Sequence, residues 1–264
     1  MTAPPLASSP GAKPPGPAAR TRQLLRDSPL TVAAAVVSTL FFGAQLAVPA
    51  VAGTLQRDAG IVGEGQWWRV LTALLVQPSG WGQFAYNTLG LVLVGVVVER
   101  WCGRIRWLAV GLAAGLAGAV VTVVLDPSGS GGGSSDVVAG LIGALAVTAW
   151  RTGRPPPLPA LLYAGHFAVY LTFLAAAGAV AATVAGTVAI ALAAAAHRAG
   201  RARPPVLGLL AVVVCGAGVM TVLGDDHGIG LLAGLVLALV WGLPAGRMAA
   251  VGGGQGAREP RRRS

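Results

Sequence analysis

Charged residues are scarce in this sequence. Only 11% of the 264 residues are Asp, Glu, Lys or Arg, whereas soluble domains carry roughly 25%. Hydrophobic residues make up 55% of the chain, and the mean hydropathy is +0.71. Because so few charges cannot cover the surface of a water-soluble domain, the composition excludes that class and predicts a membrane protein.

Cysteine is also rare, and acidic residues are few. Cys102 and Cys215 have neither metal-ligand spacing nor further partners, so we expect no structural disulfide, no metal and no cofactor. Nineteen Lys and Arg against nine Asp and Glu give a net charge of +10. The basic residues stand in short clusters between apolar segments. That distribution indicates membrane lipids as partners and a topology signal, and it argues against nucleic acid.

Apolar runs of membrane-spanning length account for most of the chain. A bilayer core of about 30 Å needs about 20 helical residues. The run at 158–196 is roughly twice that length, so we expect an inserted helical hairpin over 158–197 that turns near 176–178. The sequence thus predicts an all-α bundle of about eight spans, at residues 30–48, 83–98, 105–125, 137–149, the two arms of 158–196, 206–223 and 228–243.

The two ends of the chain have a different composition. Residues 1–26 are rich in Pro, Ala and Ser, which predicts a disordered tail. Residues 247–264 form a second, basic tail, and 27–246 form the membrane domain. The small residues at 47–52 also fit a signal-peptide cleavage site. The apolar run before them is about 19 residues, longer than the 7–15 residues of a signal core, which favours a retained first span.

The arginine clusters predict an orientation. If the amino terminus is cytoplasmic, every short basic cluster falls on the cytoplasmic side, as the positive-inside rule requires. Only Arg57 and Arg69, in the long first loop, lie on the other side. We therefore expect a multi-pass protein of a bacterial-type plasma membrane with both termini in the cytoplasm. The clusters are Arg100, Arg104 and Arg106, then Arg151 and Arg154, then Arg198, Arg201 and Arg203, then Arg247 and the tail arginines.

Two helix starts carry residues suited to catalysis. A glycine-rich loop turns into an apolar helix at Ser135, and a second apolar helix begins near His227. In the predicted topology both starts lie on the non-cytoplasmic side, with Asn87 one turn into the second span from that side. A serine beside a histidine base, with N–H donors for an oxyanion, is the arrangement for acyl transfer. The alternative is an ordinary helix cap at 134–136 and a packing amide at Asn87.

Four motifs in this order resemble the rhomboid family of intramembrane serine proteases. The resemblance covers roughly residues 65–150 and 224–243. The motifs are Trp68-Arg69; Asn87 followed by Glu99 and Gly103; Gly133-Ser134-Ser135 followed by Gly140-Leu141-Ile142-Gly143-Ala144; and His227 followed by Gly230 and Gly234.

The resemblance implies an activity and a role for each motif. Ser135 would be the nucleophile and His227 the general base and then acid of a two-residue pair, with Asn87 and Gln83 as oxyanion donors. The substrates would be peptide bonds in or near transmembrane segments of membrane proteins. The motif residues with structural roles would be Trp68, Arg69, Glu99 and Gly103 and the helix-packing glycines Gly140, Gly143, Gly230 and Gly234.

The sequence departs from the family pattern at three positions. Gln83 stands where the family usually has histidine, Asp136 where glycine follows the serine, and Ala139 where an aromatic residue often stacks on the histidine. These departures favour, as an alternative, an inactive rhomboid-like protein that binds transmembrane segments without cutting them. A small-solute transporter is a further alternative, but its paired halves with broken helices and midplane charges are not evident in the sequence.

Overall fold

A computed structural model describes residues 16, 22–23, 26–200 and 202–241 of the chain. Apart from an isolated bridge between Arg57 and Gly131, the regular secondary structure of these residues is helical. This confirms the predicted all-α bundle. Of the two predicted tails, residues 1–15, 17–21, 24–25 and 247–264 lie outside the described part.

The helices follow the apolar runs of the sequence. Five are long and apolar enough to cross a membrane, and two further apolar helices complete the bundle, so the chain is an integral multi-pass membrane protein. In order, the helices are α2 (Pro29–Ala47), the short α3 (Ala50–Leu55), α4 (Gly60–Gly63) and α5 (Arg69–Thr72) of the first loop, the continuous span of α6 (Trp81–Gly90), η1 (Leu91–Gly95) and α7 (Val96–Cys102), α8 (Arg104–Leu125), α9 (Ser135–Thr152), α10 (Leu158–Arg198), α11 (Arg203–Val222) and α12 (Asp226–Val240).

Helix α10 contains the predicted hairpin. Gly178 has φ 83° and ψ 179°, a backbone conformation that interrupts the helix and that favours glycine. The two arms then run antiparallel, because Gly186 of the second arm lies against His166 and Tyr170 of the first. The turn therefore falls inside the predicted 176–178, and the two arms bring the number of apolar spans among the described residues to the predicted eight.

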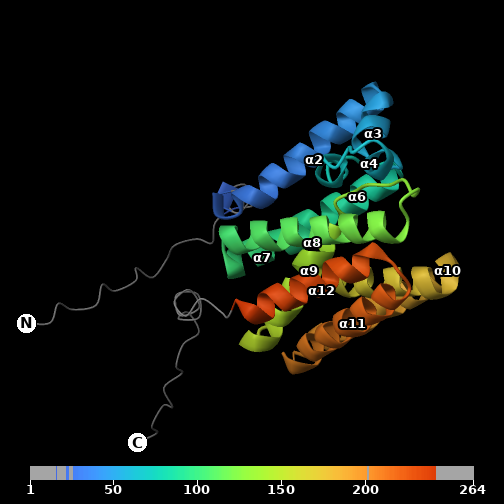
Figure 1. Ribbon diagram of the computed structural model, residues 1–264. Helices are drawn as coiled ribbons and strands as arrows, with labels where there is room; N and C mark the ends of the chain where they lie inside the picture. Colours follow the sequence, from blue (N-terminus) through green and yellow to red (C-terminus); the bar gives the residue numbers. More distant parts are fainter. Residues whose placement is uncertain (1–15, 17–21, 24–25, 201, 242–264) are drawn as a thin grey trace, which may run out of the picture.

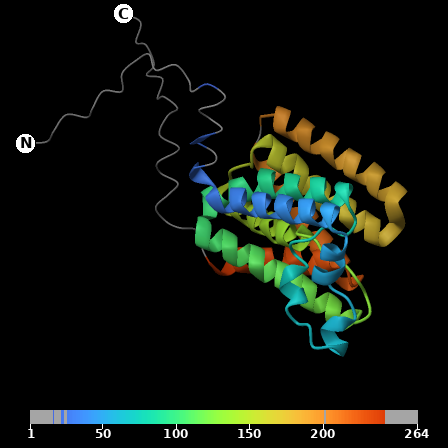
Figure 2. The same cartoon turned by 90° about the horizontal axis from the view of Figure 1, so that it is seen from above.

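Helix α9 occupies the centre of the bundle. Figure 1 shows α2 on one side and α11 on the other, with α8, α9 and α12 between them. Seen from above, α10 and α11, in yellow and orange, pack along one flank (Figure 2). All residues of α9 from 138 to 149 are buried. The residues at the start of α9 are therefore held by neighbours on several sides.

Glycines set the pairing of α9 with α12. A Cβ on Gly230 would lie 2.9 Å from the carbonyl oxygen of Asp136, and one on Gly234 would overlap the carbonyl oxygen of Gly140. Small residues of this kind let helices approach closely in lipid. Because the paired positions increase together, 136 with 230 and 140 with 234, the two helices run parallel. Their amino-terminal ends therefore meet at the same end of the bundle.

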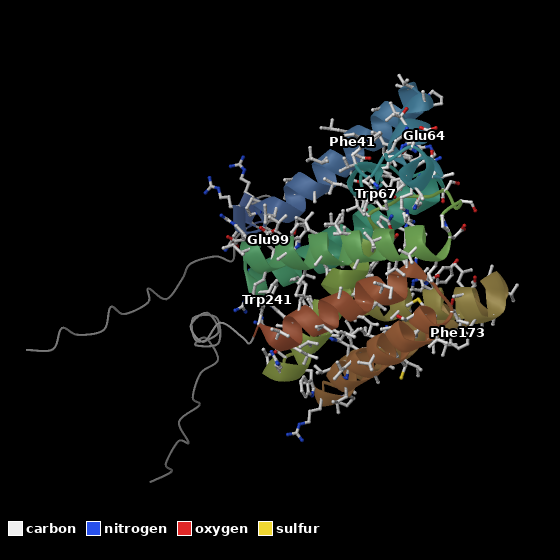
Figure 3. All side chains as sticks on the ribbon, viewed as in Figure 1. Phe41, Glu64, Trp67, Glu99, Phe173 and Trp241 are labelled. Atoms are coloured by element: carbon white, nitrogen blue, oxygen red, sulfur yellow. The ribbon has the colours of Figure 1, made fainter. Side chains whose placement is uncertain are left out.

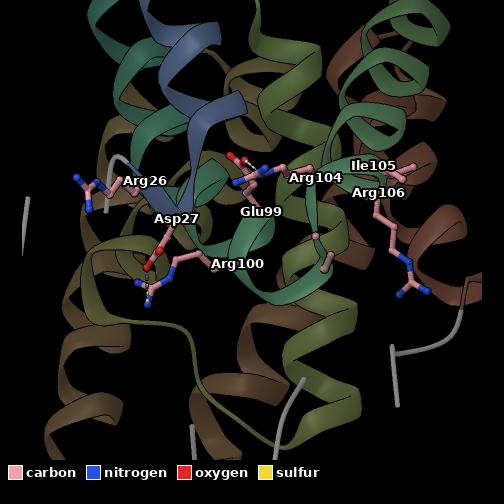
Figure 4. Close-up of a pocket in the computed structure, with 9 residues that line it drawn as sticks. Arg26, Asp27, Glu99, Arg100, Arg104, Ile105 and Arg106 are labelled. Carbon is pink, nitrogen blue, oxygen red and sulfur yellow. Dashed lines mark ion pairs between the residues drawn. The ribbon is translucent and has the colours of Figure 1, made fainter. Parts of the chain in front are cut away.

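The opposite end of the bundle carries the first of the predicted arginine clusters. Glu99 and Trp241 lie at this end, whereas Glu64 lies toward the other (Figure 3). A pocket there is lined by Arg26, Asp27 and Glu99 together with Arg100, Arg104 and Arg106 (Figure 4). Among the described residues, the cluster of Arg100, Arg104 and Arg106 therefore lies at this end, away from the starts of α9 and α12.

Candidate functional site

A cavity of about 200 Å³ lies where α9 and α12 begin. Three of the residues singled out from the sequence, Ser135, His227 and Gln83, line it together. Asn87 is not part of its lining and is 2% exposed behind it. The fold thus brings together side chains that are 92 residues apart in the chain.

Ser135 is the first residue of α9, and the turn before it is held by backbone hydrogen bonds. Gly133 has φ 136° and donates its N–H to the carbonyl of Ala73 at 2.8 Å. Ser134, the N-cap residue, is buried and accepts a hydrogen bond from Gln77 Nε2 at 3.3 Å. Ser135 itself is only partly buried and faces the cavity. The unpaired N–H groups of the first turn, at the positive end of the helix dipole, lie beside it.

Two side-chain amides lie against this turn. Gln83 Nε2 donates to the carbonyl of Gly132 at 2.6 Å, and a Cβ on Gly133 would lie 3.3 Å from Asn87 Nδ2. Asn87 Nδ2 donates to Gln77 Oε1 at 2.8 Å. Each amide nitrogen carries two hydrogens, and one of them is used in these bonds. The second hydrogen of Gln83 and of Asn87 is left for another acceptor.

Gln77 was missed in the sequence analysis. It is fully buried and joins Asn87 to Ser134. Its main chain is paired in turn with the side chain of Gln45 in α2, at 2.8 Å in both directions. A lone glutamine in the first loop gives no sequence signal for this role, because its partners come from three separate segments.

His227 is held by the aspartate that caps its helix. Asp225 accepts the backbone N–H of His227 at 3.0 Å, and its Oδ1 lies 2.7 Å from the Nδ1 of the imidazole. Because an ionised carboxylate only accepts hydrogen bonds, Nδ1 carries a proton in this contact, and in the neutral imidazole Nε2 is then the acceptor. A general base needs that tautomer. Asp225 was not among the site residues predicted from the sequence.

The imidazole lies near an aromatic ring from another helix. Phe167 of α10 is fully buried, and its ring centroid lies 6.0 Å from that of His227 at an interplanar angle of 69°, an edge-to-face arrangement. Tyr86 stacks on Phe167, with ring centroids 5.9 Å apart. The small Ala139, where the family pattern has an aromatic residue, is fully buried in α9. The hairpin of α10 therefore supplies an aromatic contact to the histidine, which the uniform apolar run of α10 did not reveal.

Charged side chains surround the cavity. Arg57 Nη2 pairs with Asp226 Oδ2 at 3.1 Å, and Thr122 donates to the same oxygen at 3.2 Å. Asp226 Oδ1 lies 3.2 Å from His227 Nδ1. Asp136 is 4% exposed. Its Oδ1 atom is buried without a hydrogen-bond partner among the described residues.

The remaining motif residues lie outside the cavity. Arg69 binds the carbonyls of Gly53 and Gln56, at 3.2 and 3.3 Å, and forms an ion pair with Asp58. Its guanidinium also lies 5.3 Å from the ring centroid of Trp68. The Trp-Arg motif thus ties the first loop together.

Glu99 and Gly103 lie at the arginine end. The buried Glu99 carboxylate accepts the N–H groups of Leu30 and Thr31, at 3.0 and 2.8 Å, and so caps the first turn of α2. Gly103 has φ 90° and separates α7 from α8. Both residues lie at the end of the bundle opposite Ser135, and their roles are structural: one caps α2 and the other forms the turn between α7 and α8.

Comparison with known proteins gives a family and two relatives. The model of the Rhomboid domain matches residues 64–200, which are 137 of the 264 residues. His227 lies beyond the matched range. The rhomboid protease GluP of Bacillus subtilis (strain 168) is 38% identical over 89 residues, which cover 34% of this chain and 17% of that protein.

A second relative covers less of this chain. The putative rhomboid protease YdcA of the same organism is 32% identical over 66 residues, 25% of this chain and 33% of that protein. The chain therefore aligns with a third or less of the length of these two relatives. No solved structure matches the chain significantly.

Proposed function

Since the chain belongs to the rhomboid family, we propose that it is a serine endopeptidase that hydrolyses peptide bonds in or near transmembrane segments of other membrane proteins. The observation that carries the proposal is that Ser135 and His227 line one cavity at the parallel starts of α9 and α12. A hydroxyl, an imidazole and unpaired helix N–H groups are the parts that acyl transfer requires.

The proposed reaction proceeds through an acyl-enzyme. Ser135 Oγ attacks the substrate carbonyl carbon while His227 Nε2 takes the hydroxyl proton. Asp225 keeps the proton on Nδ1 and stabilises the imidazolium. His227 then donates its new proton to the leaving amine as the peptide C–N bond breaks. The same imidazole then deprotonates a water molecule, which attacks the ester carbonyl. The imidazolium returns that proton to Ser135 Oγ as the ester C–O bond breaks and the carboxylic acid product leaves.

The oxyanion is stabilised by the loop and helix start around Ser135. The backbone N–H of Ser135 points from the positive end of α9. The second amide hydrogens of Gln83 and Asn87, both placed against Gly133, are the side-chain donors. Removing one such donor typically lowers the rate by about 10²- to 10³-fold.

We further propose that the cavity opens toward the non-cytoplasmic side. The cluster at 100–106 lies at the opposite end of the bundle, and Arg151 binds the carbonyls of Ala238 and Leu239 at the far end of α12. The positive-inside rule assigns the arginine-rich end to the cytoplasm. Substrate segments would then reach the cavity from the lipid or from outside the cell.

An activity-probe experiment tests the proposal. The purified chain in liposomes is incubated with a fluorogenic transmembrane substrate and a serine-directed fluorophosphonate. We expect labelling and cleavage that are lost in Ser135→Ala and His227→Ala and kept in Ser128→Ala, an exposed loop hydroxyl. Labelling that survives in Ser135→Ala and is lost in Ser134→Ala would show that the nucleophile has been assigned to the wrong serine.

A second candidate is a rhomboid-like protein that binds transmembrane segments without cutting them. The observation that favours it is the buried carboxylate of Asp136 beside the nucleophile, because a negative charge there opposes an oxyanion. Absence of label and of cleavage in the wild type, together with photo-crosslinking of an intact transmembrane peptide, would establish this candidate.

A further inference from the structure

Three side chains of metal-ligand type meet in the cavity. One ligand atom each from Asp136, Asp226 and His227 lies within 4.8 Å of the other two. All three residues line the 200 Å³ cavity. Asp136 comes from the start of α9 and the other two from the start of α12, so no local spacing in the sequence predicts the cluster.

The charge balance around the cluster is negative. Asp225 is hydrogen-bonded to His227. Asp226 forms an ion pair with Arg57 and accepts a hydrogen bond from Thr122. Asp136 is 4% exposed, and its Oδ1 atom has no hydrogen-bond partner among the described residues. Three carboxylates thus face one guanidinium and one imidazole. A buried carboxylate without a partner is costly, and a cation in the cavity would remove that cost.

We propose that Asp136, Asp226 and His227 bind a divalent transition-metal ion of the Zn²⁺ type, and that the bound ion switches off the Ser135–His227 pair. Two carboxylate oxygens and one imidazole nitrogen form a donor set that suits Zn²⁺, whereas Mg²⁺ and Ca²⁺ prefer oxygen ligands throughout. The second part of the proposal rests on the proposed function.

The distances suit such an ion. Bonds of about 2.0–2.2 Å in a tetrahedral site place neighbouring ligand atoms roughly 3.3–3.6 Å apart. His227 Nδ1 and Asp226 Oδ1 already lie 3.2 Å apart. Arg57 and Thr122 hold the other oxygen, Oδ2, and so leave Oδ1 on the side of the imidazole. Rotation of the unpartnered Asp136 carboxylate completes the set.

Binding of the ion would remove the general base. If the ion binds Nε2, it occupies the lone pair that must accept the Ser135 proton. If it binds Nδ1, the single ring proton of the neutral imidazole moves to Nε2, which can then only donate. In both cases Ser135 stays protonated, so the ion inhibits the reaction and takes no part in it.

Metal binding is measured first, without reference to activity. The metal-stripped full chain in detergent competes with a fluorescent zinc indicator for Zn²⁺. We expect one Zn²⁺ per chain and no effect of millimolar Mg²⁺. Affinity should fall at least tenfold in Asp136→Asn and in Asp226→Asn, and stay unchanged in Asp126→Asn, an exposed carboxylate of the preceding loop. The metal site is overturned if the wild type does not bind Zn²⁺. It is also overturned if Asp136→Asn and Asp226→Asn both bind Zn²⁺ with the affinity of the wild type.

Inhibition is measured second, by fluorophosphonate labelling of the same samples. Zn²⁺ should block labelling of the wild type, EDTA should restore it, and any labelling of Asp136→Asn should resist Zn²⁺. Bound Zn²⁺ with undiminished labelling overturns the regulatory step. Labelling without Zn²⁺ binding overturns the metal site and leaves the protease standing. Zn²⁺ binding with no labelling under any condition overturns the protease and leaves the metal site standing.

Discussion

Helices α9 and α10 have similar compositions and opposite environments. Both are built mainly from Ala, Val, Leu and Gly. In α9 all residues from 138 to 149 are buried, whereas only eight of the 41 residues of α10 are. In a bilayer, lipid is as apolar as a helix neighbour, so hydrophobicity does not decide which helix is central. Contacts through small residues do, and in α9 they position the candidate site.

The largest expected effect comes from adding a side chain at the glycine contact between α9 and α12. In Gly234→Ala the added Cβ overlaps the carbonyl oxygen of Gly140, which is backbone and cannot move aside alone. We expect the free energy of unfolding to fall by more than about 4 kcal/mol. Thermal unfolding in detergent measures it.

Gly218→Ala in α11 is the matched control. Nothing lies within 4 Å of the Cβ it adds, and alanine favours a helix over glycine, so its melting temperature should not fall below that of the wild type. Equal stability of both variants would refute the claim that the glycine contact makes α9 central.

Loss of the carboxylate beside His227 should be the next largest effect. In Asp225→Asn the charge-assisted hydrogen bond to Nδ1 becomes a neutral one. A bond to a charged group is worth about 1.5–3 kcal/mol, which corresponds to a roughly 10- to 100-fold lower kcat. KM should stay the same, because no substrate contact is lost. Asp126→Asn is the control, and an unchanged kcat in Asp225→Asn would remove Asp225 from the mechanism.

Phe167 tests the contribution of α10 to the site. Phe167→Leu keeps an apolar side chain but removes the edge-to-face contact with His227. Such contacts are worth about 0.5–1.5 kcal/mol, so we expect kcat to fall roughly two- to tenfold. Phe173→Leu, on the exposed face of the same helix, is the matched control. If the two variants had equal kcat, α10 would have no part in positioning the histidine.

The smallest effect should come from the lipid-facing side of α10. Val184 is 61% exposed in the bundle, so Val184→Ala exchanges one lipid-facing apolar residue for another. We expect the unfolding free energy to change by less than about 0.5 kcal/mol, measured in the same detergent as Gly234→Ala. A loss above 2 kcal/mol would show that this face packs on protein.

The spans and the hairpin were predictable from the sequence because they depend on length. An apolar run of twice the bilayer thickness has to turn, and Gly178 turns it within the predicted residues. Ser135, His227 and Gln83 could be singled out from the sequence for another reason: they lie in short local motifs at helix starts. The contacts of Gln77 and Phe167 were not predictable, because each joins segments far apart in the chain.

By itself, the sequence determined that this is a multi-pass helical membrane protein of the rhomboid family, because hydrophobic length and local motifs are properties of contiguous residues. Only the tertiary structure decided that α9 is central, that Phe167 meets His227, and that Asp136 and Asp226 face the same imidazole. The physical reason is that side chains on separate helices interact at distances of a few ångströms. Those distances depend on how closely the glycines allow the backbones to pack.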